Sequence, residues 1–265
     1  MSRALPYWHV DAFTDRAFGG NQAAVMPLDD WFEDDLLLAI AAENNFAETA
    51  FCVRDASGEA DWDLRWFTPA EEVRLCGHAT LASGHVLLAR DGGERVRFRT
   101  RRAGTLEVAR AEAGYELALP LIRTERGEWV EAVQLLGAQP QEVWLHPDGY
   151  GVYLFASEDA VRALDPDLRA LGALGNDQFI CTAPGSDTDV VSRVFVPGAG
   201  VDEDSFTGSA HAVLTHFWTE RLGRSSFTAC QASRRGGQAI CRRDGERAVL
   251  SGHCVTVVEG RFFLP

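Results

Sequence analysis

Glu48, His78 and Asp204 are the side chains whose types and surroundings could move a proton. Glu48 lies between apolar residues in N-N-F-A-E-T-A-F-C-V, where a loop is expected to pass into a strand. A carboxylate in apolar surroundings has a raised pKa and can act as a general base. The spacing alone favours the plainer interpretation, a strand residue that faces solvent. A lone histidine near a helix start is likewise more often a structural donor than a catalyst.

His78 and Asp204 follow or lie in two glycine-containing loops, each of which is expected to open a buried helix. The first is C-G-H-A-T around Gly77 and the second is T-G-S-A-H around Gly208. The unpaired N–H groups at a helix N-terminus can hold a carboxylate or a phosphate. A single such glycine is better explained as a residue that permits a tight turn. Because the loop occurs twice, we favour a binding site for an anionic substrate.

The elements around these loops are repeated along the chain. Residues 61–69 read D-W-D-L-R-W-F-T-P and residues 189–197 read D-V-V-S-R-V-F-V-P, so four of nine positions match at an offset of 128. The same offset pairs Phe51 with Phe179. An irregular acidic loop, a glycine and a helical pattern follow each proline. Aligning Gly77 with Gly208 requires three extra residues in the second loop and places His78 opposite Ser209.

Chance similarity between two strand–helix units is the alternative, but a fixed offset in two separate segments favours duplication. Alternating and helical apolar patterns predict the local structure of each half. Helices are expected at 34–44, 80–89 and 211–221, and strands at 9–13, 51–54, 95–99, 105–109, 115–119, 238–242, 248–252 and 254–259. The two later helices are apolar nearly all round and should be buried. The polar segment 121–128 is the best candidate for a linker.

The composition excludes several classes of function. The chain has 265 residues and a net charge of −14, which disfavours nucleic-acid and membrane-surface roles. All 25 basic residues are arginine. The absence of lysine excludes lysine Schiff bases, hence pyridoxal-phosphate chemistry, and a Walker A loop. No G-x-G-x-x-G follows an expected strand. With no membrane span or signal peptide evident in the sequence, we expect a cytoplasmic protein.

The six cysteines form no C-x-x-C pair and match no zinc-site spacing, so we expect neither disulfides nor a metal.

The chain resembles the phenazine-biosynthesis PhzF-like family, which shares the diaminopimelate-epimerase-like fold. The resemblance covers nearly the whole chain and rests on four motifs. These are V-D-A-F-T-D-R-A-F-G-G-N-Q-A-A-V at 10–25, A-E-T-A-F at 47–51, W-F-T-P-A-E-E-V-R-L-C-G-H-A-T at 66–80 and V-D-E-D-S-F-T-G-S-A at 201–210. Each motif alone is weak, but together they are highly specific.

The resemblance implies an α+β fold of two similar halves, each a curved, mostly antiparallel sheet around a central helix, with the site between them. We expect the halves to span 1–120 and 121–265, the last strand completing the first half. The resemblance also implies a homodimer. It implies a cofactor-independent isomerase that moves a proton on a small carboxylate, as in the isomerisation of trans-2,3-dihydro-3-hydroxyanthranilate.

The resemblance implies roles for individual residues. Glu48 matches the family's base, and His78, Asp204 and Ser209 match the residues that assist it. Backbone groups around Gly77 and Gly208 would hold the substrate, with the neighbouring Cys76 and Thr207 as further binding residues. Ser205 stands where many members have proline, which would change the stiffness of that loop.

Two other functions remain open. An amino-acid epimerase of this fold uses two cysteines, one in each half, as acid and base. Cys76 matches the first, but we align the second with Phe206, which disfavours a two-thiol mechanism. The other alternative is a binding protein that keeps the cleft without catalysis. The sequence does not name the substrate, because the side chains around the site set specificity.

Overall fold

The structure is a computed structural model that describes residues 3–112 and 114–264. The chain divides into two compact units. The first consists of the residues up to Leu119 together with those from Ser251 onward, and the second of Pro120–Leu250. The last strand of the chain therefore belongs to the first unit.

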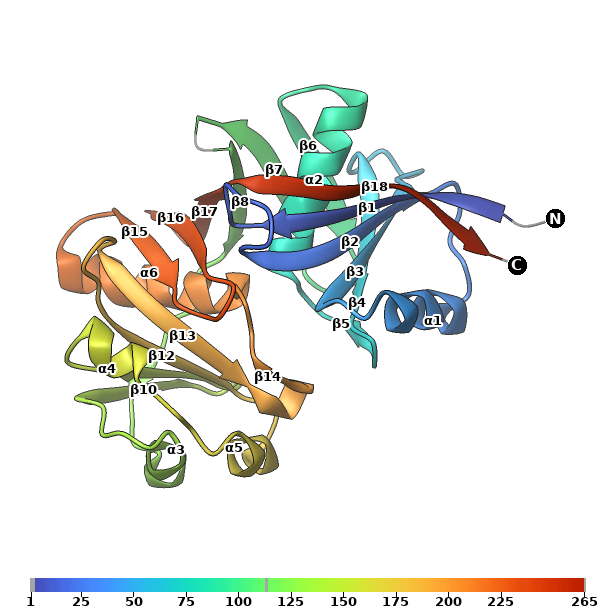
Figure 1. Ribbon diagram of the computed structural model, residues 1–265. Helices are drawn as coiled ribbons and strands as arrows, with labels where there is room; N and C mark the ends of the chain where they lie inside the picture. The colour runs from blue at the N-terminus through green and yellow to red at the C-terminus, as the bar shows by residue number, and fades with distance from the viewer. Residues whose placement is uncertain (1–2, 113, 265) are drawn as a thin grey trace. The chain divides into compact units, whose positions relative to one another are not determined.

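The first unit is a mixed sheet that curves around one helix. Its elements are β1 (Arg3–Ala12), β2 (Asn21–Leu28), α1 (Asp34–Asn44), β3 (Glu48–Arg54), β4 (Trp62–Phe67), β5 (Glu72–Val73), α2 (Gly77–Asp91), β6 (Arg95–Thr100), β7 (Thr105–Ala111), β8 (Gly114–Pro120) and β18 (Cys254–Leu264). The strands pair in the order β18-β1-β2-β3-β4-β6-β7-β8, with β5 added beside β4. The pairs β2–β3 and β4–β6 are parallel, and the others are antiparallel. Figure 1 shows β18 lying along β1.

Helix α2 forms the centre of this unit because its sequence is apolar or small on nearly every side. Eleven of its fifteen residues are buried, among them the polar His78, Thr80 and Ser83. The helix packs against β1, β2, β3, β6 and β7. Gly84 permits this packing, since a Cβ atom there would lie 2.3 Å from a methyl carbon of Val108. The buried helix expected from the sequence is confirmed.

Helix α1 covers the other face of the first sheet. Its start has two acidic residues, Asp34 and Asp35, which favour a helix N-terminus. It ends where Asn45 takes a left-handed conformation with φ 51°. Leu37 and Ile40 pack in a core with Phe51 and Phe67 of the neighbouring strands.

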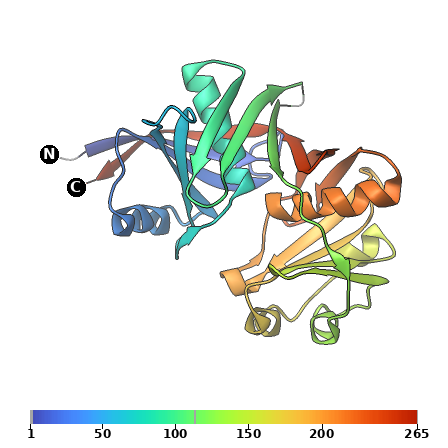
Figure 2. The ribbon, with the colours of Figure 1, turned by 180° about the vertical axis from the view of Figure 1, so that it is seen from behind.

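The second unit repeats this arrangement. Its elements are β9 (Glu125–Arg126), α3 (Val130–Leu135), β10 (Glu142–His146), β11 (Tyr150–Leu154), α4 (Glu158–Arg162), α5 (Leu168–Leu174), β12 (Gln178–Pro184), β13 (Val190–Val196), the 3₁₀ turn η1 (Pro197–Ala199), β14 (Val201–Glu203), α6 (Gly208–Leu222), β15 (Ser226–Gln231), β16 (Gly237–Asp244) and β17 (Arg247–Gly252). Strands β9-β10-β11-β12-β13-β15-β16 pair in that order, with β14 beside β13. Seen from behind, α6 (orange) lies along the strands of this unit (Figure 2).

The order and direction of the strands confirm the duplication. From β1 to β7 the successive pairings are antiparallel, parallel, antiparallel, parallel and antiparallel, and β10 to β16 have the same sequence of pairings. One ion pair is also repeated. Nε of Arg65 lies 2.7 Å from Oε1 of Glu72, and Nε of Arg193 lies 2.8 Å from Oε1 of Glu203. A second bond from Nη2 makes both pairs bidentate.

Three details of the expected organisation are wrong. The acidic loops are not wholly irregular, because β5 and β14 each pair with the preceding strand and are held by the repeated arginine–glutamate pair. The segment 121–128 is not a free linker, since β9 joins the second sheet beside β10. Phe51 does not match Phe179, because the strand partners of Phe67 and Phe195 are Thr49 and Phe179.

All six cysteines are free thiols, and four of them are buried. Among residues 3–112 and 114–264, no helix is both long and apolar enough to cross a membrane.

Candidate functional site

Glu48 is the first residue of β3, at the junction that the sequence predicts. The strand pairs in parallel with β2, where Ala23 lies opposite Glu48. The side chain of Glu48 is 17% exposed, so it is neither a free surface residue nor sealed in the core. Nε2 of His78, the second residue of α2, lies 3.0 Å from Oε2 of Glu48. The solvent-facing alternative for Glu48 is therefore wrong.

This contact is an ion pair rather than a well-directed hydrogen bond. The Oε2 atom of Glu48 is buried, and no described residue donates a hydrogen bond to it. The imidazole supplies charge beside the carboxylate, but its N–H does not point at this oxygen. A lone pair of Oε2 is therefore left for another partner, which is what a base requires.

His78 is held from its other side by Asn21 and by Cys76. Nδ1 of His78 lies 3.1 Å from the amide nitrogen of Asn21 and 3.6 Å from the sulfur of Cys76. Burial acts to lower the pKa of His78, but the neighbouring Cys76 and the Glu48 carboxylate raise it well above its usual 6.5. The carboxylate is the cause that operates at neutral pH, because Cys76 is then a neutral thiol. The raised pKa favours an imidazolium beside the carboxylate, and this form requires the Asn21 amide to present its oxygen to Nδ1–H.

Cys76 precedes α2 and is buried. Burial is the main cause that raises the pKa of its thiol to about 11, and the Glu48 carboxylate adds to the effect. A thiol with this pKa is protonated at neutral pH and is a poor base. Cys76 is therefore ill suited to remove a proton at neutral pH.

The position of Asn21 depends on the glycine before it. Gly20 has φ +57°, and a Cβ atom there would lie 2.1 Å from the carbonyl oxygen of Ala12. Only glycine fits this turn, which leads directly into β2 and sets Asn21 against His78.

In the second unit, Asp204 and Thr207 lie in the loop before α6. The hydroxyl of Thr207 donates to Oδ2 of Asp204 at 2.6 Å. Gln231 lies at the end of β15 and is fully buried, and its side chain bonds to the backbone of this loop. Its Oε1 accepts from the Thr207 N–H at 2.9 Å, and its Nε2 donates to the Asp204 carbonyl at 2.7 Å.

Ser209 is the second residue of α6, as His78 is of α2. Its hydroxyl lies 3.1 Å from Nε2 and 3.2 Å from Oε1 of Gln178. Gln178 is the first residue of β12 and matches Glu48 in the strand register, because Thr49 pairs with Phe67 as Phe179 pairs with Phe195. The pair Glu48–His78 in the first unit thus has the counterpart Gln178–Ser209 in the second.

The starts of α2 and α6 have the form that anion binding requires. The helices begin at Gly77 and Gly208, and the preceding residues, Cys76 and Thr207, are extended and give no side-chain cap. Thr207 is therefore the structural match of Cys76, and the alignment of Phe206 with that position is wrong. Either residue lacks a thiol, so the argument against two cysteines is unchanged.

Phe206 has a packing role. Its ring stacks on His211 with centroids 4.1 Å apart. Burial lowers the pKa of His211 to about 4, so this imidazole is neutral. It bonds back to the carbonyl of Thr207 and steadies the first turn of α6.

The sequence analysis did not single out Asn21, Gln178 or Gln231. Asn21 lies within a motif that carries the family resemblance, which is the one signal that pointed to it. Gln178 begins β12 and Gln231 ends β15, and a polar residue at a strand end does not by itself indicate a site.

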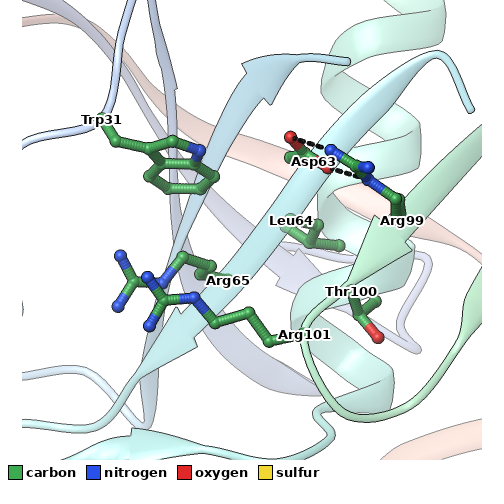
Figure 3. Close-up of a pocket in the computed structure, with 7 residues that line it drawn as sticks. All are labelled: Trp31, Asp63, Leu64, Arg65, Arg99, Thr100 and Arg101. Carbon is green, nitrogen blue, oxygen red and sulfur yellow. Dashed lines mark hydrogen bonds and ion pairs between the residues drawn. The ribbon is translucent and has the colours of Figure 1, made fainter. Parts of the chain in front are cut away.

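A pocket of about 320 Å³ lies elsewhere in the first unit and is not part of this site. Figure 3 shows its lining, with the guanidinium groups of Arg65 and Arg101 side by side and Arg99 bound to Asp63. Arg65 and Asp63 share the face of β4 opposite to that expected for Glu48 on β3, since successive side chains alternate. All three arginines already pair with carboxylates, so the pocket offers an anion little uncompensated charge.

Two similar units, each a sheet around a buried helix, define an α+β protein of the epimerase-like fold. Residues 10–260 match the sequence model described as phenazine biosynthesis-like protein, PhzC-PhzF. The chain belongs to this family.

Individual relatives agree over almost the full length. The chain is 48% identical to an uncharacterized isomerase of Pseudomonas aeruginosa, over 98% of this chain and 99% of the relative. A solved PhzF-family protein of Enterococcus faecalis is 37% identical, with a TM-score of 0.91 over 99% of this chain and 100% of that one. A hydroxyproline epimerase of Agrobacterium vitis shares the fold alone, with a TM-score of 0.65 and 13% identity over 99% of this chain and 93% of that one.

Proposed function

We propose that the protein is a cofactor-independent isomerase that moves a proton on a small carboxylate substrate. Relatives of 48% and 42% identity that carry the name isomerase support the reaction class. The observation that carries the proposal is the contrast between Glu48–His78 and its counterpart Gln178–Ser209. An amide and a hydroxyl cannot take up a proton near neutral pH, so the duplicated position holds one base and not two.

A single base fits an isomerisation better than an epimerisation. In the proposed reaction, the Glu48 carboxylate removes a proton from one carbon, and the resulting carboxylic acid returns it to another carbon of the same substrate. The His78 imidazolium stabilises the carboxylate and orients it. An epimerase needs an acid and a base on opposite faces of one carbon, and the second unit lacks the matching group.

The remaining residues would bind the substrate. We assign the uncapped helix starts to anionic groups of the substrate, because their backbone N–H groups favour negative charge: Gly77 with the neighbouring Cys76, and Gly208 with Thr207. Asp204 and Ser209 assist as the family resemblance implies. The substrate is of the class of trans-2,3-dihydro-3-hydroxyanthranilate, a cyclic carboxylate with an activated C–H bond.

Deuterium exchange tests the proposal. The protein is incubated in heavy water with dihydrohydroxyanthranilate and a panel of cyclic and amino-acid carboxylates, and incorporation is followed by mass spectrometry. Glu48→Gln makes the first unit resemble the second and should slow exchange by about 10²–10⁴-fold. Gln178→Asn, at the matching position, is the control and should retain exchange.

Exchange that persists in Glu48→Gln would remove Glu48 as the base. Tight binding of a carboxylate without any exchange would favour a binding protein.

A further inference from the structure

The carboxylate, imidazole and thiol of the first unit lie close enough to hold a metal ion. One donor atom each from Glu48, Cys76 and His78 can be chosen so that all three lie within 4.8 Å of one another. Nε2 of His78 is 3.0 Å from Oε2 of Glu48 and 3.9 Å from the sulfur of Cys76. These residues come from two elements, β3 and the start of α2, which packing fixes relative to each other.

The distances are close to those of a tetrahedral site. With bonds of about 2.0–2.3 Å, two donors of a tetrahedral zinc site lie roughly 3.4–3.6 Å apart. The two distances of 3.0 and 3.9 Å lie on either side of that range. The third distance, between a Glu48 carboxylate oxygen and the sulfur of Cys76, is at most 4.8 Å, so an ion would have to draw the three side chains together by shifts on the order of 1 Å.

The surroundings also suit a ligand set. A metal-bound histidine usually donates its other ring N–H to a polar partner, and the side-chain amide of Asn21 lies beside Nδ1 of His78, with its nitrogen 3.1 Å away. Turned over, this amide would present its oxygen to Nδ1–H and leave Nε2 for an ion. No described residue donates a hydrogen bond to Oε2 of Glu48, so this atom has a lone pair to offer. Three protein ligands leave the fourth position of a tetrahedral ion to water or a small anion.

We propose that Glu48, Cys76 and His78 form a binding site for a thiophilic divalent cation such as Zn²⁺. A sulfur, nitrogen and oxygen donor set favours Zn²⁺ or Co²⁺ over Mg²⁺ and Ca²⁺, which prefer oxygen alone. The ion would occupy the lone pair that the proposed base needs, so Zn²⁺ would inhibit the isomerase. Only this inhibition rests on the proposed function; the binding does not.

Cobalt is the probe for the binding, and no substrate is needed. The untagged protein is titrated with Co²⁺ in a buffer that does not chelate metals. A thiolate-to-cobalt charge-transfer band in the near ultraviolet, with the visible bands of tetrahedral Co²⁺, is expected at one ion per chain. Excess Zn²⁺ should displace the cobalt, whereas Mg²⁺ should not.

Variants assign the ligands. Cys76→Ser should abolish the charge-transfer band, and Glu48→Gln should weaken Zn²⁺ binding while leaving the thiol in place. Asn21→Ala should weaken it by about 10–100-fold through the imidazole. Cys230→Ser, at a partly exposed cysteine of the second unit, is the control and should bind as the wild type does.

The absence of a charge-transfer band in the wild-type protein, or a band unchanged in Cys76→Ser, would overturn the proposal. Unaltered Zn²⁺ affinity in Glu48→Gln would remove the carboxylate from the site. If cobalt binds as described but isomerisation is never found, the metal site stands and the proposed function fails. If isomerisation is found and Zn²⁺ binds without slowing it, the inhibition is refuted.

Discussion

Gln178 occupies in the second unit the strand position that Glu48 holds in the first. Each begins a strand, and each contacts the second residue of the unit's central helix, Ser209 or His78. Duplication has therefore kept the geometry of the contact while its chemistry has diverged. The first copy carries charge and can exchange a proton, and the second can only donate and accept hydrogen bonds.

Removal of the Cys76 thiol should leave catalysis largely intact. Because burial raises the pKa of this thiol to about 11, Cys76 is not a base at neutral pH. Deuterium exchange by Cys76→Ser should stay within about tenfold of the wild type, while Glu48→Gln loses about 10²–10⁴-fold. If the serine variant lost as much as the glutamine variant, a thiol mechanism would have to replace the carboxylate.

The charge on His78 should depend on Glu48. Burial lowers the pKa of His78, and Cys76 and the Glu48 carboxylate together raise it above its usual 6.5. Of these two neighbours, Glu48 is the one that is charged at neutral pH. NMR titration of the ring in isotope-labelled protein should show the His78 pKa well above 6.5 in the wild type and markedly lower in Glu48→Gln. Equal His78 titration in the two proteins would contradict the ion pair.

The same shift links stability to pH. Because the pKa of His78 is higher in the folded than in the unfolded chain, its stabilisation is complete below pH 6.5 and is lost as pH rises through the folded pKa. Urea unfolding of the wild type and of His78→Gln should therefore differ more at about pH 6 than at about pH 9. A difference that is constant over this range would show that His78 contributes only packing.

Gln231 should act as a positioning residue for Asp204. Gln231→Ala leaves the N–H of Thr207 and the carbonyl of Asp204 without their partner, which should cost about 1–3 kcal/mol of unfolding free energy. Gln238→Ala, at an exposed position of β16, is the control. Gln231→Ala should also lower turnover, because Asp204 loses the contact that positions it. Gln231→Glu keeps the acceptor for the Thr207 N–H and should recover part of that turnover. A variant that loses stability but keeps full turnover would confine Gln231 to a structural role.

The repeated arginine–glutamate pair should matter more in the first unit. The Arg65 side chain is 3% exposed and that of Arg193 is 15% exposed. Arg65→Gln removes two hydrogen bonds to Glu72 and leaves this carboxylate paired with Arg101 alone, which should cost about 1–3 kcal/mol. Arg193→Gln should cost less, and urea unfolding compares the two. Equal losses of unfolding free energy in the two variants would show that the exposure of the arginine does not affect the stability that the pair contributes.

Acid should weaken this pair. Arg65 lowers the pKa of Glu72 below its usual 4.5, so the stabilisation is present above pH 4.5 and is lost as pH falls through the folded pKa.

The repeated architecture could be predicted because it depends on local apolar periodicity and on a motif that occurs twice in the sequence. Apolar periodicity located α1 at its observed bounds, and the matching strands at 61–69 and 189–197 revealed the duplication. The central helices begin three residues earlier than the periodicity indicated, at Gly77 and Gly208. A glycine at these positions predicts a loop. Because the helices in fact begin at the glycines, His78 and Ser209 lie in the first helical turn.

The partners of the site residues could not be predicted in this way. Asn21 and His78 are 57 residues apart, and Gln178 and Ser209 are 31 apart. Such contacts depend on how strands order and how helices pack, which no local pattern specifies. The match between Glu48 and Gln178 was also hidden, because the offset there is 130 rather than 128.

The last strand has a consequence for how the chain matures on the ribosome. Strand β18 pairs with β1 from Arg3 to Ala12, so β1 is made before the second unit and its partner strand only after it. The second unit, Pro120–Leu250, is contiguous and has all its strands earlier. Vectorial synthesis therefore favours the second unit as the first to finish folding, because the unit that holds Glu48 and His78 needs β18, which follows the second unit in the chain.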